Sequence, residues 1–297
     1  MKYREIQDIL RGQIFEDEPL SKHTSYRIGG PADLYALPAD VEDLTALLRV
    51  CGEREIPAFV IGKGTNLLVN DLGFRGVVVD LKAACGALRT DGEEVIAGSA
   101  VRIKRLTAWC EERGLGGLEF MSGIPGTVGG ALRMNAGAFG GEISDRLRWI
   151  EGIAPDGTRQ RWVKAELDFG YRRAGGLEDR VIVGCAFGLA RTDAALLTTQ
   201  RKEILRKRNA RQPLEVPSAG SVFKRPEGDY AGRLIEAAGC KGLRVGDAMV
   251  SPKHANFIVN LGRATASEVR TVIERVRERV EEKFGIVLEL EIQLVGF

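Results

Sequence analysis

The sequence SAGSVFKRP places a serine, Ser221, directly behind a glycine and puts two cations, Lys224 and Arg225, within the next four residues. A serine hydroxyl that attacks a substrate needs an adjacent base, which is most often a histidine. The whole chain holds only two histidines, His23 and His254. Ser221 is therefore either an ordinary turn residue or a hydroxyl whose chemistry needs no histidine.

A hydrolase built on Ser221 and His254 is one alternative. Many such enzymes carry a G-x-S-x-G turn at the end of a buried strand. The residues around Ser221 do not match that pattern, and they follow a segment that contains Pro213 and Pro217. The sequence therefore does not favour a serine hydrolase.

Glycine is the most informative residue type, with 37 in the chain, and it concentrates at positions 27–30, 62–64 and 123–141. Backbone that turns with positive φ, or that lies against a ligand, needs residues without a Cβ. One such cluster is typical of tight turns. Three clusters in the first half of the chain favour a bound ligand.

Two of these clusters have features of a phosphate site. A predicted strand at 58–61 runs into GKGTN, whose successive N–H groups could face a pyrophosphate. GKGTN lacks the third glycine of a Rossmann fingerprint and the Walker pattern, so alone it favours a tight turn over a phosphate site. Residues 122–141 mix glycines and hydroxyls with larger apolar side chains, which predicts an ordered loop. Together the two segments predict a dinucleotide cofactor without a Rossmann motif.

Length and charge exclude several classes of protein. The 297 residues, with 44% hydrophobic and 28% charged side chains, are typical of a globular protein with one large or two ordinary domains. The net charge of +2 gives no general argument for nucleic acid or an acidic membrane surface. The sequence shows neither the apolar core of a signal peptide nor a membrane-spanning run. We expect no membrane and no nucleic-acid partner.

Cysteine usage points to a reducing compartment. The five cysteines are odd in number, widely spaced and without a C-x-x-C pair, which fits reduced thiols in a cytoplasm better than disulfides or a zinc site. The two histidines are far apart in the sequence, which argues against a histidine-based metal site. We therefore predict a cytoplasmic protein without a bound metal.

The elements that would position these residues follow an α+β pattern. Hydrophobic periodicity predicts strands at 32–37, 58–61, 77–81, 149–153, 158–163 and 181–187, and helices after Asp40 and at 103–113. Pro155-Asp156-Gly157 predicts a hairpin turn.

A polar, arginine-rich helix predicted at 193–210 could be a nucleic-acid patch, but its interleaved leucines favour a connecting helix with a solvated face. Beyond it we expect a shorter α/β region. That region should contain a helix with a Thr265–Glu268 capping box and a Gly285 stop, followed by a final strand at 287–294.

Seven ordered blocks resemble those of the UDP-N-acetylenolpyruvoylglucosamine reductase family, also called UDP-N-acetylmuramate dehydrogenase. They are TSYRIGGPAD, GKGTNLLVND, SGIPGTVGGALRMNAGAFGGEI, FGYR, SAGSVFKRP, SPKHANFIVN and ELEIQLVG. The resemblance spans residues 20–297, and the compact length is similar to that of the type II form. It implies an FAD-binding domain of the vanillyl-alcohol-oxidase (PCMH) type at 1–195, to whose site the C-terminal strand could return. It also implies a C-terminal α/β substrate-binding domain at 196–297.

The resemblance implies that NADPH reduces a non-covalent FAD, which then reduces UDP-N-acetylglucosamine enolpyruvate to UDP-N-acetylmuramate for peptidoglycan. By position in the blocks, Ser221 would donate a proton to the substrate carbon. Arg172 would stabilise the charge that builds on the carboxylate, although Arg173 lies beside it. Glu291 would be protonated or hydrogen-bonded to the substrate carboxylate, which predicts a raised pKa. Glu289 and Glu291 could instead form the outer face of a strand.

The same resemblance implies the binding residues. Substrate contacts fall on Tyr171, Lys224, Arg225 and Asn256, although many relatives carry Asn at the position of Arg225 and His254 could be structural. Cofactor contacts fall on Ile61, Gly62, Lys63, Gly64, Thr65, Asn66, Leu67, Ser122, Pro125, Gly126, Thr127, Gly129, Gly130, Ala131, Asn135, Gly137 and Ile182. A flavin oxidase that uses oxygen and a non-catalytic binding protein remain alternatives.

Overall fold

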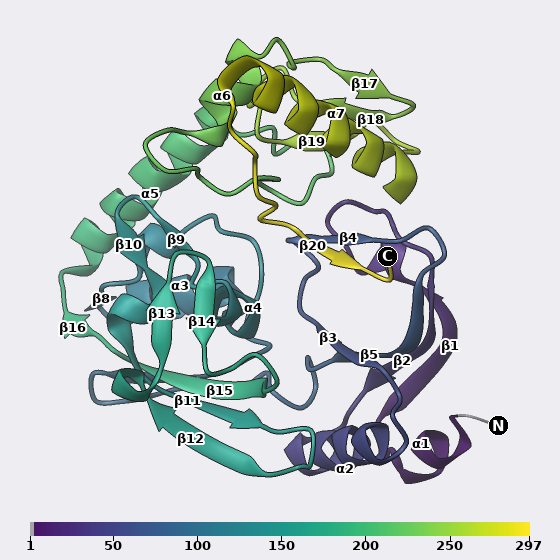
Figure 1. Cartoon of the computed structure of the whole chain (residues 1–297). Helices are drawn as coiled ribbons and strands as arrows, with labels where there is room; N and C mark the ends of the chain where they lie inside the picture. The colour runs from purple at the N-terminus through teal and green to yellow at the C-terminus, as the bar shows by residue number, and fades with distance from the viewer. Residues whose placement is uncertain (1–2) are drawn as a thin grey trace. The chain divides into compact units, whose positions relative to one another are not determined.

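The structure of the protein is a computed structural model that describes residues 3–297. Residues 1 and 2, the start of the predicted FAD-binding domain, lie outside the described residues. The chain packs into two compact units, whose elements are labelled in Figure 1. The first unit comprises residues 1–16, 34–62 and 76–207, and the second comprises 17–33, 63–75 and 208–297. Each unit is thus assembled from segments that are distant in the sequence.

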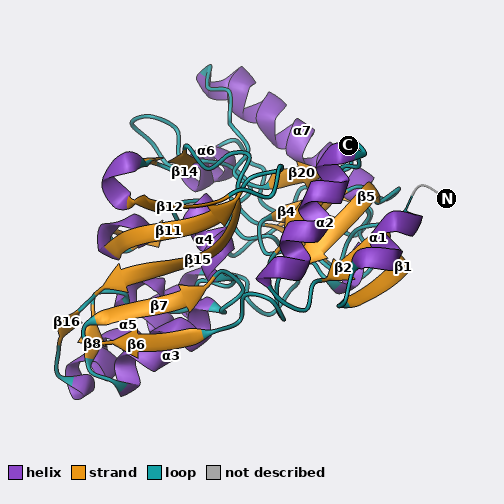
Figure 2. Cartoon of the chain, turned by 90° about the horizontal axis from the view of Figure 1, so that it is seen from below, coloured by secondary structure: helices purple, strands orange, loops and turns teal. Residues whose placement is uncertain are grey.

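A five-stranded antiparallel sheet of order β12-β11-β15-β7-β6 forms the centre of the first unit (Figure 2). Its strands are β6 (Leu88–Asp91), β7 (Glu94–Gly98), β11 (Leu147–Ile153), β12 (Arg159–Val163) and β15 (Val181–Gly188). The predicted hairpin between β11 and β12 is confirmed. Its turn closes because the Asp156 carboxylate accepts the N–H of Thr158 at 2.8 Å and Ala154 accepts the N–H of Gly157 at 2.9 Å.

A second sheet, of order β1-β2-β5-β3, accompanies two helices. The elements are α1 (Arg4–Ile9), β1 (Gln13–Pro19), β2 (Pro31–Leu37), α2 (Val41–Glu53), β3 (Ala58–Ile61) and β5 (Phe74–Asp80). Asp40 caps α2 as predicted, because its carboxylate accepts the N–H of Asp43 at 2.9 Å. Strand β3 matches the predicted residues and runs parallel to β5, which begins three residues earlier than expected.

The remaining elements of the first unit are short except for two helices. They are α3 (Ile103–Glu112), β8 (Leu115–Gly116), η2 (Glu119–Met121), α4 (Val128–Arg133), β9 (Gly137–Ala138), β10 (Gly141–Glu142), η3 (Ile143–Arg146), η4 (Lys164–Glu166), β13 (Asp168–Gly170), β14 (Arg173–Gly175), β16 (Ala190–Arg191) and α5 (Ala194–Arg211). Helix α5 buries only Leu197 among its described residues, which fits the expected solvated helix.

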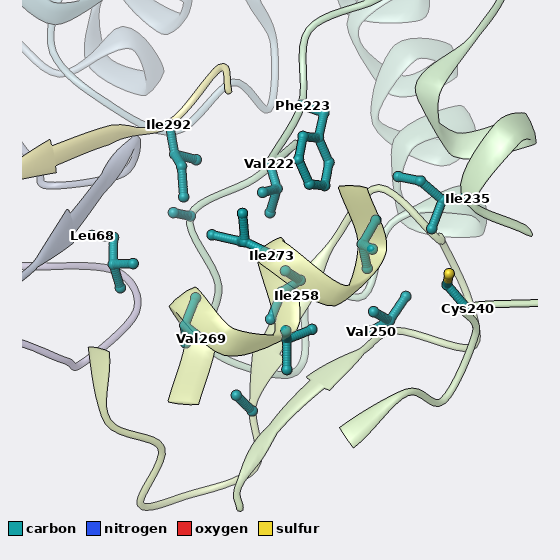
Figure 3. Close-up of a cluster of buried hydrophobic side chains, with 14 of the residues drawn as sticks. Leu68, Val222, Phe223, Ile235, Cys240, Val250, Ile258, Val269, Ile273 and Ile292 are labelled. Atoms are coloured by element: carbon teal, nitrogen blue, oxygen red, sulfur yellow. The ribbon is translucent and has the colours of Figure 1, made fainter. Parts of the chain in front are cut away.

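The second unit packs around a long amphipathic helix. Its elements are η1 (Leu20–Lys22), β4 (Leu67–Val69), α6 (Ala231–Ala237), β17 (Arg244–Val245), β18 (Ala248–Val250), β19 (Ile258–Asn260), α7 (Ala266–Phe284) and β20 (Gln293–Val295). Helix α7 begins with the predicted capping box, since Thr265 and Glu268 exchange hydrogen bonds of 3.1 Å, and it ends at Gly285, whose φ is +67°. Val269 and Ile273 point from α7 into the core shown in Figure 3.

The prediction of one continuous strand at 287–294 is wrong. Only Gln293–Val295 forms a strand, β20, which runs parallel to β4. Upstream, Leu290 forms an isolated antiparallel bridge with Phe223. The tail therefore changes partner between Leu290 and Gln293, and a segment that changes partner cannot continue a single ladder.

Candidate active site

The segment that carries Ser221 lies hydrogen-bonded beside the segment that carries Glu291. The N–H of Lys224 donates to the carbonyl of Glu289, and the N–H of Glu291 donates to the carbonyl of Val222, each at 2.8 Å. In Figure 3, Val222 and Ile292 point into the same apolar cluster. Both backbone bonds and shared burial thus hold the two segments together within the second unit.

The two glutamates of ELEIQ occupy different environments. Glu289 is exposed and forms an ion pair with Lys224, with 3.2 Å between Lys224 Nζ and Glu289 Oε2. Glu291 is half-buried, and so is Ser221. Neither glutamate lies in a strand and only Glu289 is exposed, so the alternative that both form the outer face of a strand is wrong.

The GKGTN segment is hydrogen-bonded to the C-terminal block ELEIQLVG within the second unit. The side-chain amide of Asn66 donates to the carbonyl of Glu291 at 2.9 Å, and the carbonyl of Asn66 accepts the N–H of Gln293 at 2.8 Å. Gly64 has φ +56°, and a Cβ there would lie 2.3 Å from the carbonyl oxygen of His23. This glycine is thus required both by its backbone conformation and by close packing.

Ser25 is a residue that we did not select from the sequence. Its hydroxyl donates to the carbonyl of Ser218 at 2.6 Å, and its N–H donates to the carbonyl of Gly64 at 3.0 Å. It thereby links GKGTN to SAGSVFKRP inside the second unit. The only signal in the sequence was its place in the TSYRIGGPAD block, because one serine in a loop carries no pattern.

In the SPKHANF block, Asn256 binds the Ser221 segment and His254 binds Asn256. The side chain of Asn256 is 7% exposed; its Oδ1 accepts the N–H of Phe223 at 2.9 Å, and its Nδ2 donates to the carbonyl of Phe223 at 2.8 Å. The Nδ1 of His254 accepts the N–H of Asn256 at 3.3 Å, and its ring packs edge-on against Phe257. His254 therefore serves as a neutral acceptor. Burial, aided by the cations Lys241 and Arg211, lowers the pKa of His254 below its usual value.

Arg225 extends the cationic end of SAGSVFKRP. Its guanidinium stacks over the ring of Tyr230, with 4.2 Å between the guanidinium carbon and the ring centroid. Tyr230 is 60% exposed. Lys224 and Arg225 therefore each have a neighbour within the second unit, a carboxylate for Lys224 and an aromatic ring for Arg225.

In the first unit, Arg172 occupies the tip of a tight hairpin. Strands β13 and β14 pair Gly170 with Arg173, which leaves Tyr171 and Arg172 as the turn. Arg172 has φ +56°, a left-handed conformation that costs energy for a residue with a side chain. Its guanidinium lies 4.8 Å from the ring of Tyr171, which is 48% exposed. Arg173 instead pairs with Asp168 at 2.6 Å, which distinguishes the two adjacent arginines.

The glycine-rich loop of the first unit packs closely against neighbouring segments of the chain. A Cβ at Gly62 would lie 2.6 Å from Thr127 Oγ1, and one at Gly129 would lie 2.8 Å from the Cβ of Ser99. Thr127 caps α4 by accepting the N–H of Gly130. The hydroxyl of Ser122 is buried and has no hydrogen-bond partner within residues 3–297. A buried hydroxyl without a partner is costly, so it fits a loop that completes its hydrogen bonds with a ligand.

Asn135 connects this loop to the arginine hairpin. Its side chain is fully buried, and its amide donates to Glu142 Oε2 at 2.7 Å and to the carbonyl of Gly170 at 3.1 Å. Gly170 directly precedes the Tyr171–Arg172 turn. The loop and the hairpin therefore form one hydrogen-bonded assembly in the first unit.

The other predicted cofactor residues differ in exposure. Ile61, Leu67, Ala131 and Ile182 are buried in or beside the cores, so they could reach a ligand mainly through their backbone. Lys63, Pro125 and Gly130 are exposed, and Thr65, Gly126 and Gly137 are half-buried.

Within residues 3–297 no group of three or more His, Cys, Asp or Glu side chains could hold a metal ion. No helix in that range is long and apolar enough to cross a membrane. All five cysteines are free and buried, and burial raises the pKa of Cys51 and Cys85 to about 11 and that of Cys110 to about 12.

Comparison with known families covers both parts of the chain. Residues 32–162 match the FAD binding domain family, and residues 212–295 match the C-terminal domain of UDP-N-acetylenolpyruvoylglucosamine reductase. These matches confirm the predicted α+β fold, with an FAD-binding domain and a reductase C-terminal domain.

Full-length relatives give the same result. UDP-N-acetylenolpyruvoylglucosamine reductase 2 of Symbiobacterium thermophilum is 47% identical over 96% of this chain and 93% of its own length. The reductase of Desulforamulus reducens is 44% identical over 98% and 97%. The crystal structure of the reductase from Thermus caldophilus superposes with a TM-score of 0.83, at 35% identity over 96% of this chain and 99% of that one. The chain therefore belongs to the UDP-N-acetylenolpyruvoylglucosamine reductase family of FAD-containing oxidoreductases.

Proposed function

We propose that this chain reduces UDP-N-acetylglucosamine enolpyruvate to UDP-N-acetylmuramate, a peptidoglycan precursor, with FAD as cofactor and NADPH as reductant. Family membership over almost the whole chain supports the reaction. The observation that carries the residue assignment is the hydrogen-bonded register between the Ser221 and Glu291 segments. This register joins the two segments that carry the catalytic candidates, which are 70 positions apart in the sequence (291 − 221).

The residues proposed to hold FAD lie in GKGTN and in the glycine-rich loop. The buried, unpartnered hydroxyl of Ser122 fits a polar ligand that completes its hydrogen bonds, and the missing Cβ atoms at Gly62 and Gly129 let Thr127 and Ser99 pack closely against these segments. FAD, when bound, supplies hydride transfer from NADPH to the enolpyruvyl double bond. The remaining candidates are Ile61, Lys63, Gly64, Thr65, Asn66, Leu67, Pro125, Gly126, Thr127, Gly130, Ala131, Asn135, Gly137 and Ile182.

Ser221 is proposed to donate the proton. Once hydride has reached the terminal carbon of the enolpyruvyl group, the adjacent carbon carries carbanion character and must be protonated. A serine hydroxyl is a weak acid, but such a carbon is basic enough to take its proton when the two are held in contact. This assignment explains why the site needs no histidine, and it agrees with the structural use of His254 as a backbone acceptor.

Arg172 and Glu291 are proposed to stabilise the carboxylate side of the substrate. An arginine fork suits a carboxylate on which charge accumulates. The left-handed backbone of Arg172 supports this role, because local strain of this kind concentrates at functional sites. Glu291 would contribute as a protonated or hydrogen-bonded carboxyl, because a second free carboxylate would repel the developing charge.

The diphosphate is proposed to lie against Lys224 and Arg225, with Tyr171 as a further substrate contact. Lys224 already neutralises Glu289, so the approach of a diphosphate would exchange one anionic partner for another.

In functional terms, we assign residues 1–195 to FAD binding and 196–297 to substrate binding. We further propose a cytoplasmic location, which the five unpaired cysteines support.

The purified protein tests this function directly. We expect a yellow protein whose visible flavin absorbance bleaches with NADPH under anaerobic conditions. It should recover on addition of UDP-N-acetylglucosamine enolpyruvate and not on addition of UDP-N-acetylglucosamine. Protein without bound flavin, or reduced flavin that re-oxidises only with oxygen, would contradict the proposal; the second result would indicate an oxidase.

A further inference from the structure

The main chain at Phe223 has hydrogen-bonding needs that the C-terminal tail does not meet. Phe223 and Leu290 face each other as an antiparallel bridge, and the bonds of that bridge run through Val222 and Lys224. In such a pair, alternate residues turn their N–H and C=O groups to opposite sides. The N–H and C=O of Phe223 therefore point away from the tail, and Phe223 is only 1% exposed, so water cannot satisfy them.

Asn256 supplies both missing partners. Its side-chain Oδ1 accepts the N–H of Phe223, and its Nδ2 donates to the carbonyl of Phe223, as a neighbouring strand would. Its own carbonyl accepts the N–H of Val222 at 2.9 Å. Three hydrogen bonds thus join Asn256 to the two residues that directly follow Ser221.

We infer that Asn256 is a positioning residue, which acts on the reaction by holding the Ser221 segment in register with the Glu291 segment. The inference rests on the proposed role of Ser221 as proton donor. It replaces direct substrate contact as the role of this residue, since Asn256 is only 7% exposed and its Oδ1 and Nδ2 each bind Phe223. A proton donor must lie in close contact with the carbon that it protonates, so a small displacement of its segment slows proton transfer strongly.

Asn256→Asp is the informative substitution because it preserves the shape of the side chain and replaces only the Nδ2 donor with an oxygen. An ionised carboxylate keeps the acceptor for the Phe223 N–H but places an oxygen against the Phe223 carbonyl. We expect flavin reduction by NADPH to change by less than about twofold, because that step does not involve Ser221. Re-oxidation of the reduced enzyme by saturating substrate should slow by about 100-fold at pH 8.

The pH dependence supplies a signature that loss of folded protein would not produce. As the pH falls, the introduced carboxyl becomes protonated and can again donate to the Phe223 carbonyl. Burial should raise the pKa of the introduced carboxyl, so that it becomes protonated at a higher pH than an exposed aspartate. The ratio of variant to wild-type re-oxidation rate, corrected for folded protein at each pH, should therefore rise as the pH falls from 8 to 5.

Asn260→Asp is the matched control. Asn260 is a buried asparagine in the same block, 2% exposed, and it bonds to the carbonyl of Tyr26 and the N–H groups of Gly262 and Ala264. It should lose comparable stability but re-oxidise at the wild-type rate once corrected for folded protein. Equal slowing in both variants would make the role of Asn256 merely structural and overturn the inference.

Two further outcomes would also overturn it. A dissociation constant raised by about tenfold or more with an unchanged saturated rate would make Asn256 a substrate ligand. If neither Asn256→Asp nor Asn256→Ser gives folded protein while Asn260→Asp does, Asn256 is a folding determinant. Failure of the wild-type protein to reduce the enolpyruvyl sugar would instead refute the proposed function, so the two failures are distinguishable.

Discussion

The side-chain amide of Asn66 donates a hydrogen bond of 2.9 Å to the carbonyl of Glu291, a residue 225 positions later in the chain. A residue of the predicted cofactor segment thus holds the main chain of the proposed catalytic glutamate. In Asn66→Asp, two oxygens would face each other at this contact. We expect the free energy of unfolding to fall by about 1–3 kcal/mol, together with slower re-oxidation by substrate, measured by denaturant titration and stopped-flow absorbance.

Asn70→Asp is the control for Asn66→Asp. Asn70 lies in the same block and uses its side-chain oxygen to accept the N–H of Leu72, which a carboxylate also does. It should keep near wild-type stability and rate. Equal effects of the two substitutions would show that added charge in this block, and not the bond to Glu291, is responsible.

Ser221→Ala should separate the two halves of the reaction. We expect NADPH to reduce the flavin at the wild-type rate, because this step needs no proton from Ser221. Turnover of the enolpyruvyl substrate should fall by about 10²–10⁴-fold, the usual contribution of a general acid. Ser218→Ala is the matched control, because the bond to Ser25 uses the carbonyl of Ser218. Normal turnover by Ser221→Ala would remove the proton-donor assignment.

The two glutamates of the tail should respond differently to neutralisation. Glu289→Gln removes an exposed ion pair with Lys224 and should cost less than about 1 kcal/mol of stability. It should leave the saturated rate near that of the wild type. Glu291→Gln should lower the saturated rate by about tenfold or more if Glu291 acts as a proton-bearing carboxyl. Steady-state kinetics at saturating NADPH make the comparison, and similar rates for both variants would contradict the assignment.

Gly62→Ala should weaken the proposed cofactor site. The new Cβ would lie 2.6 Å from Thr127 Oγ1, which cannot move freely because it caps α4. We expect a lower flavin content per protein after gel filtration. Gly184→Ala, whose Cβ would lie 3.6 Å from the Ala97 carbonyl oxygen in ordinary contact, is the control. Full flavin retention by Gly62→Ala would show that close approach at this position is not needed.

His254 should make stability depend on pH. Burial lowers its folded pKa below the ordinary value of 6.5, so the unfolded chain binds more protons as the pH falls below that value. The free energy of unfolding should therefore decrease from about pH 6.5 downward and stay level with respect to this group above it. Denaturant titrations at pH 5–8 should show a shallower decrease for His254→Gln, whose amide can also accept the Asn256 N–H. If the unfolding free energies of the wild type and His254→Gln decreased in parallel, His254 would not be the source of this pH dependence.

Several elements could be predicted because their signals lie within a few residues. The Asp40 cap, the Pro155–Gly157 turn and the Thr265–Glu268 capping box each depend on hydrogen bonds between groups two or three positions apart. The apolar face of α7 follows from the helical repeat alone. The family blocks added the candidate residues Ser221, Arg172 and Glu291, but not what surrounds them.

The partners of the polar side chains could not be predicted in this way. Ser25, Asn66 and Asn256 bind main-chain groups that lie 193, 225 and 33 positions away, respectively. The expected strand at 287–294 failed for the same reason, because the tail exchanges the Phe223 segment for β4 midway. Sequence alone determined which local elements form and which family the blocks resemble. Only the tertiary structure decided which buried main-chain groups lacked a partner, because that depends on which distant segments pack together.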